Sequence, residues 1–274
     1  MPELPEVQTV VNQLRPLLVG ERLKSINPVW PKVFHNFTNS KIQKTLEDNL
    51  IVDVTRRAKF IIIGFKNSII AVHLRMTGKL YLHSSTEPLP KYTSAYFCFE
   101  STKVLIFDDV RKFGRIYLYR TISPIDKRHG PEPLANDFNI SSFIALLKTK
   151  KRNIKGLLLD QKIIAGLGNI YVDESLWASG IHPNSISNLI PVKKYALLYK
   201  NIKKILIDSI EQNGTTIIDF SVNGKSGKYV NKLKVYGKQN LNCMSCPNKI
   251  KKIRVAGRGT YVCTKCQKKY KPGS

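Results

Sequence analysis

The sequence predicts an α+β protein of two domains, with an antiparallel β-sandwich first and a helical part that ends in a small metal-binding hairpin. Three observations lead to this prediction. Short β-type runs fill residues 51–119, helical periodicity replaces them after residue 138, and two Cys-x2-Cys pairs lie near the end of the chain. The length of 274 residues is enough for two domains of ordinary size.

The first predicted element is an amphipathic helix over residues 5–18. Pro5 suits the first turn of this helix, and Gly20 suits its end. Its apolar residues recur at helical spacing and are Val7, Val10, Val11, Leu14 and Leu18. A helix that packs by this face holds Pro2 and Glu3 in place, whereas most chain termini are disordered.

Short β-type runs separated by turn residues follow the helix, and their spacing favours an antiparallel sandwich. The expected strands are 51–55, 59–65, 69–74, 79–82, 95–100, 104–107 and 115–119. A linker is expected over 122–137, because this segment contains one glycine and three prolines.

The pattern after the linker is helical. The expected helices are 141–148, 154–159, 170–178 and 193–212. Residues 213–228 contain three glycines and are expected to form a loop. Two short strands around the cysteine pairs are expected to complete the terminal hairpin.

The formal net charge of +26 predicts a polyanionic partner. No Asp or Glu follows Asp219, whereas fourteen Lys and Arg residues do, so the positive charge is concentrated in the last fifth of the chain. No apolar run has the length of a membrane span, and Glu3 and Glu6 do not fit a signal peptide. Nucleic acid is therefore favoured over a membrane, although a lysine-rich proteome also raises charge without specific meaning.

The cysteines predict one structural zinc ion. Cys243-x2-Cys246 and Cys263-x2-Cys266 have the spacing of a tetrahedral four-thiolate site. The alternative is a pair of disulfides in a secreted protein, against which the N-terminal sequence argues. Cys98 lies in an apolar strand and is expected to be an inert core residue.

The N-terminus is a candidate reactive site. Removal of Met1 makes Pro2 a free secondary amine beside the carboxylate of Glu3. An α-amino group has a pKa of about 7.7–8, so part of it is neutral near pH 7 and able to attack an aldehyde-like carbon. The alternative is an ordinary helix start, with proline in the first turn and glutamate near the positive end of the helix dipole.

Four further segments are weaker candidates. Gly166-x-Gly168-Asn169 can form an anion site at a helix start, although many such turns only connect helices. Arg111-Lys-Phe113-Gly can wedge into a base stack, although its aromatic ring can equally fold onto the sandwich. Lys59 and Lys155 follow basic residues, and most such lysines are only solvated.

Together these segments resemble the formamidopyrimidine-DNA glycosylase family over nearly the whole chain. The segments that carry the resemblance are Met1-Pro-Glu-Leu-Pro-Glu-Val7, Arg57-Ala-Lys59, His73-Leu-Arg-Met-Thr-Gly78, Asp109-Val-Arg-Lys-Phe-Gly114, Gly130-Pro-Glu-Pro-Leu134, Gly166-Leu-Gly-Asn-Ile-Tyr171, Glu174-Ser-Leu176, Gly180-Ile-His-Pro183, Gly214-Thr-Thr216 and Gly257-Arg-Gly-Thr260. Leu4 favours this branch over the related endonuclease VIII branch, which typically has glycine there.

The resemblance implies a division of the chain and a role for each candidate residue. The implied parts are a catalytic β-sandwich over 1–121, the linker 122–137, a helix–two-turn–helix domain over 138–235 with a lesion loop at 215–229, and a zinc finger over 236–274. By this resemblance Pro2 is the nucleophile, Glu3 is the acid and base, and Glu6 supports the site. Lys59 and Lys155 contact phosphate or the lesion, and Asn169 and Arg258 bind the phosphates that flank it. Met76, Arg111 and Phe113 fill the gap that the displaced nucleotide leaves in the duplex.

The implied activity is excision of oxidised purines from double-stranded DNA, followed by strand cleavage at the abasic site through β- and δ-elimination. A monomer is expected, and the lack of a targeting segment in the sequence favours a bacterial-type cytoplasm. Two departures from the family are visible: Tyr92-Thr-Ser94 replaces a frequent His-x-His, and the lesion loop is slightly short. The alternatives are an endonuclease VIII-like enzyme for oxidised pyrimidines and a non-catalytic zinc-finger protein that binds damaged DNA.

Overall fold

The structure is a computed structural model that describes residues 1–38, 40, 49–215, 221–222 and 225–273. The chain forms two compact units. Unit 1 contains Met1–Lys127 and Gln212–Val230, and unit 2 contains Arg128–Glu211 and Asn231–Ser274. The described part of the predicted loop 215–229 therefore belongs to unit 1, although the sequence suggested the helical domain. The finer boundaries at 121, 137 and 235 stay a prediction.

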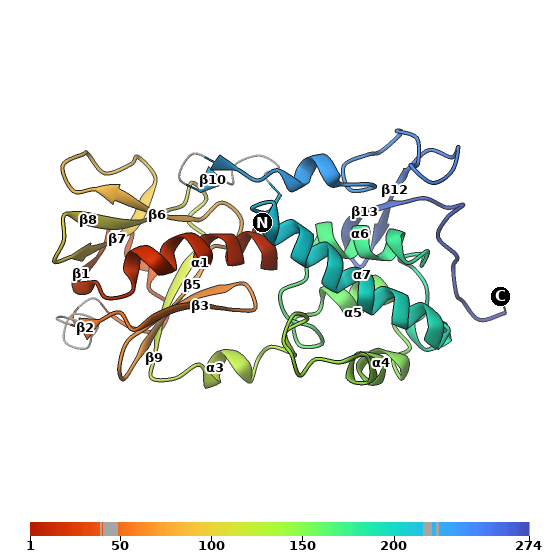
Figure 1. The fold of residues 1–274 in the computed structure, drawn as a ribbon, viewed down its shortest axis with the longest axis horizontal. Coiled ribbons are helices and arrows are strands. Elements are labelled where there is room, and N and C mark those ends of the chain that lie inside the picture. The colour runs from red at the N-terminus through yellow and green to blue at the C-terminus, as the bar shows by residue number, and fades with distance from the viewer. Residues whose placement is uncertain (39, 41–48, 216–220, 223–224, 274) are drawn as a thin grey trace. The chain divides into compact units, whose positions relative to one another are not determined.

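The two large sheets of unit 1 are antiparallel (Figure 1). One has the order β2-β1-β7-β8-β6 and the other has the order β3-β4-β5-β9. The strands are β1 Arg22–Pro28, β2 Asn49–Leu50, β3 Asp53–Arg57, β4 Phe60–Gly64, β5 Ile69–His73, β6 Lys79–Ser84, β7 Thr93–Phe99, β8 Lys103–Asp108 and β9 Arg115–Tyr119. The predicted antiparallel architecture is confirmed.

Helix α1, Leu4–Leu18, packs against β3, β4 and β6, so it contacts strands of both sheets. Its apolar face joins a single core that also receives side chains from both sheets, among them Ile63, Val72 and Phe107. The helix begins where the sequence predicts, because Pro5 lies in the first turn and the periodic valines and leucines supply a buried stripe. This packing fixes the start of the chain.

Strand β1 was not predicted from the sequence. Its sequence, Arg-Leu-Lys-Ser-Ile-Asn-Pro, is poor in β-branched and aromatic residues, and only Leu23 and Ile26 are fully buried. It is a strand because β2 and β7 pair with its two edges. Within the predicted linker, Ser123–Asp126 form the short helix α3 with Pro124 in its first turn, which the sequence analysis did not predict.

Unit 2 contains the helices that the sequence predicts. They are α4 Ile140–Lys148, α5 Ile154–Leu159, α6 Asn169–Ala178 and α7 Val192–Glu211. Asn139 and Asn153 cap α4 and α5, because each side-chain oxygen accepts a hydrogen bond from a backbone N–H in the first turn. The turn between α5 and α6 is held by Gln161, whose side chain accepts from Gly166 N and donates to Leu167 O.

The last regular elements form a hairpin of β12 Lys251–Val255 and β13 Arg258–Val262. Ala256 and Gly257 connect the strands, and both have positive φ angles, +49° and +73°. This conformation matches the right-handed twist of a hairpin and places Arg258 directly after the turn. The remaining short elements are the 3-10 turns η1 Pro31–Val33, η2 Ser187–Leu189 and η3 Tyr229–Lys232, and the strands β10 Ser221–Val222 and β11 Lys225–Ser226. Among the described helices, none is both long and apolar enough to cross a bilayer.

Candidate functional site

Pro2, Glu3 and Glu6 form a buried group at the start of α1. Pro2 is buried, and Glu3 and Glu6 are only 3% and 2% exposed. Glu3 is the N-cap, its side chain accepts from the backbone N–H of Glu6, and Glu6 Oε2 accepts from Glu3 N at 2.9 Å. This reciprocal capping box fixes the backbone next to Pro2. The three N-terminal candidates therefore lie together.

Glu6 also holds a second segment of unit 1. Its Oε1 accepts a hydrogen bond of 2.8 Å from Thr215 N. The preceding Gly214 has a φ of +77°, and a Cβ there would lie 3.0 Å from Glu6 Oε1. Glycine is therefore required for this close approach. The remainder of the predicted lesion loop, residues 216–220 and 223–224, lies outside the described residues.

Lys59 lies in the two-residue turn between β3 and β4 and is 6% exposed. The other turn residue, Ala58, has a φ of +52°, which is unfavourable for a residue with a side chain. Strain of this kind is kept only where the surrounding structure enforces it, and it is common at functional sites. Ala58 is fully buried, and the paired strands β3 and β4 hold the turn. Lys59 thus has a fixed position in unit 1.

Met76, Arg111 and Phe113 are brought together on two neighbouring turns of unit 1. Met76 and Phe113 are 45% and 47% exposed, which is unusual for large apolar side chains. The guanidinium of Arg111 lies 4.8 Å from the centre of the Phe113 ring. Thr77 and Asp109 connect the two turns, since Thr77 Oγ1 donates to Asp109 Oδ1. Asp109 belongs to a segment that the sequence singled out, but the sequence assigned no role to it.

Lys155 has a different environment from the one that the sequence suggested. Its side chain has no exposed surface, and its Nζ lies 2.6 Å from Asp173 Oδ1 and 2.7 Å from Thr260 Oγ1. Asp173 Oδ2 accepts a hydrogen bond from Tyr261 N. Burial raises the pKa of Asp173 to about 6, although the Lys155 ammonium opposes this shift. Lys155 therefore ties α5, α6 and β13 together and touches no solvent in this structure.

Asn169 and Arg258 lie at the same hairpin, within unit 2. Asn169 Nδ2 donates to Gly259 O at 3.0 Å, and Arg258 is exposed directly after the β12–β13 turn. Asn169 Oδ1 is buried and lacks a hydrogen-bond partner among the described residues. The structure thus brings two predicted phosphate-binding residues, one at the start of α6 and one at the start of β13, to the same hairpin.

Glu174 is a further functional position whose role the sequence did not indicate. Its Oε2 accepts from Lys234 N, and its Oε1 accepts from Val235 N and Tyr236 N, all at 2.8–2.9 Å. Burial raises the pKa of Glu174, whereas these three N–H groups lower it. The carboxylate on α6 thereby fixes the segment that leads into the cysteine hairpin. The motif Glu174-Ser-Leu176 was the only available signal.

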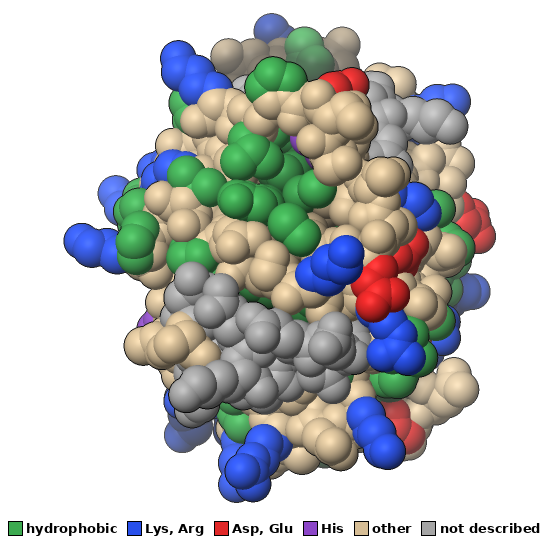
Figure 2. All heavy atoms as spheres, turned by 90° about the vertical axis from the view of Figure 1, so that its left-hand side faces the viewer, with side chains coloured by type: hydrophobic (Ala, Val, Ile, Leu, Met, Phe, Trp, Pro, Cys, Tyr) green, Lys and Arg blue, Asp and Glu red, His purple; other side chains and the backbone are tan. Residues whose placement is uncertain are grey.

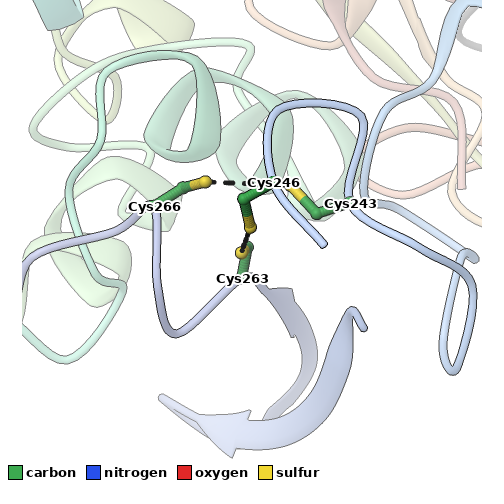
Figure 3. Close-up of side chains that lie close together, drawn as sticks. All are labelled: Cys243, Cys246, Cys263 and Cys266. Carbon is green, nitrogen blue, oxygen red and sulfur yellow. Dashed lines mark hydrogen bonds between the residues drawn. The ribbon is translucent and has the colours of Figure 1, made fainter. Parts of the chain in front are cut away.

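The four cysteines form one compact cluster (Figure 3). All four Sγ atoms lie within 4.8 Å of one another, with Cys243 and Cys266 at 3.8 Å and Cys246 and Cys263 at 3.4 Å. A tetrahedral zinc site with Zn–S bonds of about 2.3 Å requires sulfur–sulfur distances of about 3.8 Å. Burial and the neighbouring thiols raise the pKa of Cys266. Zinc binds cysteine as the thiolate, so metal binding would release the thiol protons. The cluster fits one structural zinc ion.

The positive charge is unevenly distributed over the surface. Figure 2 shows one face on which Lys and Arg side chains are scattered, while hydrophobic side chains form the main cluster. By contrast, Lys251, Lys252, Arg254 and Arg258 are all exposed on the short β12–β13 hairpin. The hairpin, rather than the face in Figure 2, has the dense positive charge expected of a phosphate-binding surface.

Comparison with known proteins gives three family matches along the chain. Residues 1–116 match the formamidopyrimidine-DNA glycosylase N-terminal domain, and residues 129–221 match the H2TH domain of the same glycosylase. Residues 241–269 match a zinc finger found in FPG and IleRS. The third match includes the four cysteines, which supports their assignment to zinc.

Full-length relatives agree with these matches. Formamidopyrimidine-DNA glycosylase of Lactobacillus gasseri is 42% identical over 277 residues, covering 99% of this chain and 100% of the relative. The protein of the same name from Bacillus licheniformis is 37% identical over 276 residues, covering 98% and 100%.

Solved structures agree as well. A complex between Lactococcus lactis Fpg and DNA containing an abasic site has a TM-score of 0.91 at 38% identity, covering 97% of this chain and 100% of that one. A mutant of Lactococcus lactis FPG bound to DNA that contains Fapy-dG has a TM-score of 0.92 at 38% identity, covering 98% and 100%. Matches of this extent in sequence and structure show that the chain belongs to the formamidopyrimidine-DNA glycosylase family.

Proposed function

We propose that the protein excises oxidised purines such as 8-oxoguanine and formamidopyrimidines from duplex DNA and then cuts the strand at the abasic site. The observation that carries this proposal is the buried pair Pro2 and Glu3, held at the start of α1 by the capping box with Glu6. The related Lactococcus structures contain Fapy-dG or abasic-site DNA, and their resemblance to this chain supports the same class of substrate.

Pro2 is the proposed nucleophile once Met1 has been removed. Its neutral secondary amine attacks C1′ of the damaged nucleotide and displaces the base, and Glu3 transfers the protons needed to open the sugar ring. The product is an iminium ion that joins Pro2 to the opened sugar. The iminium acidifies the neighbouring C–H bond, so elimination at the 3′ and then the 5′ side releases the sugar fragment and leaves a one-nucleotide gap.

The target carbon lies inside the duplex, so the damaged nucleotide must leave the base stack at a cost of a few kcal/mol. The exposed Met76, Arg111 and Phe113 are proposed to fill the gap and so offset this cost. Arg111 is proposed to face the orphaned base in this arrangement. Lys59, Asn169 and Arg258 are proposed to bind phosphates next to the lesion.

Zinc supplies structure and no chemistry in this mechanism. When bound, the ion cross-links the two ends of the hairpin through Cys243, Cys246, Cys263 and Cys266. A four-thiolate site has no open position for water or substrate. The four cysteines therefore hold Arg258 at the end of a rigid hairpin.

The proposed working form is a monomer in a bacterial cytoplasm, associated with the nucleoid through DNA. The curated relatives of known source are bacterial, and the substrate lies in that compartment.

Borohydride trapping tests the proposed function. Protein whose Met1 has been removed is incubated with a duplex carrying 8-oxoguanine opposite cytosine, and sodium borohydride reduces any iminium to a stable adduct. The matched control carries an acetyl group on the Pro2 nitrogen, which converts the reactive amine to an amide and leaves every side chain unchanged. We expect an adduct with the processed protein and none with the control.

The outcomes separate the alternative functions. Binding of the duplex without any adduct supports a non-catalytic zinc-finger protein. A stronger adduct with thymine glycol than with 8-oxoguanine supports the endonuclease VIII-like alternative. Equal adducts from the processed protein and the acetylated control rule out Pro2 as the nucleophile.

A further inference from the structure

Asp109 is a buried carboxylate between the two turns that carry the exposed Met76 and Phe113. It is 1% exposed, and both of its oxygens accept hydrogen bonds. Oδ1 accepts from Thr77 Oγ1 at 2.5 Å and from Arg111 N at 3.1 Å, and Oδ2 accepts from Gly114 N at 2.7 Å. One side chain therefore connects two turns that lie more than thirty residues apart in the sequence.

The backbone of both turns is tightly constrained. Arg75 and Lys112 have φ angles of +56° and +55°, which non-glycine residues rarely adopt. A Cβ at Gly78 would lie 2.4 Å from Leu74 O, and one at Gly114 would lie 2.3 Å from Phe107 Cζ. Glycine is therefore required at both positions, and the hydrogen bonds to Asp109 join the two turns that carry the exposed side chains.

Lys112 constrains the second turn from its other side. Its Nζ donates to Tyr92 O and Thr93 O at 3.0 Å and to Ser94 Oγ at 3.2 Å. The ammonium group is thus directed back toward β7, while its neighbours Arg111 and Phe113 stay exposed. The turn therefore exposes the Arg111 guanidinium and the Phe113 ring, whereas the Lys112 ammonium is hydrogen-bonded to the protein.

We propose that Asp109 is a positioning residue that fixes Met76, Arg111 and Phe113 as a preformed wedge before DNA arrives. This inference rests on the proposed function. A side chain that is ordered in advance loses less conformational entropy on binding, so more of its contact energy is available to displace a base. Asp109 acts through the two turns and does not touch the substrate.

The role of Asp109 belongs to one step of the reaction. An oxidised base must be unstacked before Pro2 reaches C1′, whereas a preformed abasic site has no base to unstack. Loss of the preformed wedge is therefore expected to slow base excision more than strand cleavage at an abasic site. A general loss of folding would slow both reactions together.

The test compares Asp109→Asn with the matched control Asp108→Asn. Asparagine has nearly the same size as aspartate, but one of the two oxygens is replaced by an NH2 group. This group cannot accept a hydrogen bond, whereas both oxygens of Asp109 do. Asp108 is the adjacent residue of the same type, its Oδ1 has no hydrogen-bond partner among the described residues, and burial raises its pKa. The hydrogen bonds from Thr77, Arg111 N and Gly114 N all go to Asp109, so Asp108→Asn is expected to keep the two turns joined and the excision rate unchanged.

Two single-turnover rates are measured for each protein, excision of 8-oxoguanine opposite cytosine and cleavage at a preformed abasic site. We expect Asp109→Asn to slow excision by about tenfold or more, the effect of one lost hydrogen bond to a charged group, and to change abasic cleavage by less than about threefold. Fluorescence of 2-aminopurine beside the lesion is expected to show a smaller unstacking signal in Asp109→Asn than in the wild type.

Equal slowing of both reactions, or no slowing of excision, would overturn the proposal. If Asp109→Asn does not fold, Thr77→Val removes one donor to the carboxylate with little change in shape and is expected to show the same selective slowing. A wild-type protein that cuts neither substrate contradicts the proposed function itself, so the two failures are distinguishable.

Discussion

Lys155 shows how a single residue can contribute to a site that it does not touch. The sequence indicates only a lysine after a basic run, which is usually solvated. In the structure this lysine is fully buried and bonded to Asp173 and Thr260. Thr260 Oγ1 also donates to Arg258 O. A chain of two hydrogen bonds therefore connects the Lys155 ammonium to the backbone of the exposed Arg258. The position of Arg258 therefore depends on a buried ion pair.

Removal of the Lys155 charge is predicted to destabilise unit 2. In Lys155→Met the carboxylate of Asp173 stays buried without its ammonium partner, and the free energy of unfolding is expected to fall by about 3–5 kcal/mol. Urea unfolding is followed by the fluorescence of Trp177 in a Trp30→Phe background, in which only unit 2 contains tryptophan.

Two control variants accompany this measurement. Lys151→Met changes an exposed lysine of the same segment and is expected to leave the unfolding curve unchanged. Lys155→Met combined with Asp173→Leu is expected to recover part of the loss, because neither charge is then buried alone. Wild-type stability of Lys155→Met would contradict the assigned role of the ion pair.

The β12–β13 hairpin, like Arg258, depends on groups outside itself for its position. A two-stranded sheet is marginally stable alone, and the small core beside it contains Val235, Ile250, Cys243 and Cys263. Two anchors compensate for this small core, namely the four cysteines that flank the strands and Asp173 on α6, whose Oδ2 accepts a hydrogen bond from Tyr261 N of β13. The hairpin is ordered because α6 and zinc hold it.

Cys246→Ser is predicted to release zinc and abolish DNA binding while unit 1 stays folded. Three thiolates bind zinc less tightly than four, and the hairpin that carries Arg258 loses its cross-link. Zinc content is measured by a colorimetric chelator and DNA binding by fluorescence anisotropy. Trp30 fluorescence, measured in a Trp177→Phe background, reports whether unit 1 remains folded.

The matched control for this prediction is Cys98→Ser. Cys98 lies on β7 and is separate from the cysteine cluster, so its replacement is expected to change neither zinc content nor affinity. Unchanged DNA affinity in Cys246→Ser after loss of zinc would contradict the role of the hairpin in binding.

At the scale of the whole molecule, the charge of +26 exceeds what folding requires. Its concentration after Asp219 and the exposure of Lys251, Lys252, Arg254 and Arg258 assign a large part of it to the hairpin region. Each phosphate contact releases counterions from DNA, so the number of contacts is measurable as a dependence of affinity on salt.

Arg258→Ala is predicted to weaken binding to all sequences alike and to lower the slope of log affinity against log salt by about one unit. Fluorescence anisotropy titrations at several salt concentrations measure this slope. Lys103→Ala is the control, because Lys103 lies 3.6 Å from Glu21 and its charge is already paired. An unchanged slope in Arg258→Ala would argue against a phosphate contact.

The sequence predicted the antiparallel sheets, the helices and the zinc cluster because their signals are local. Periodicity, Pro and Gly positions and Cys-x2-Cys spacing act over a few residues. Strand β1 was missed because its stability comes from pairing with β2 and β7, and helix α3 was missed because prolines obscured a single turn. The error at β1 arises because partners distant in the chain override local preference, whereas the error at α3 is a local signal that was read as a linker.

The sequence alone determined which chemistry the protein carries: a proline amine beside a carboxylate, four thiolates, and an excess of cations. Only the tertiary structure decided which side chains are exposed and which are buried and hydrogen-bonded to other segments. It buried Lys155, exposed Met76 and Phe113, and connected Asp109 to both turns. The physical reason is that a side chain's role depends on its burial and its hydrogen-bond partners, and those partners come from segments far apart in the chain.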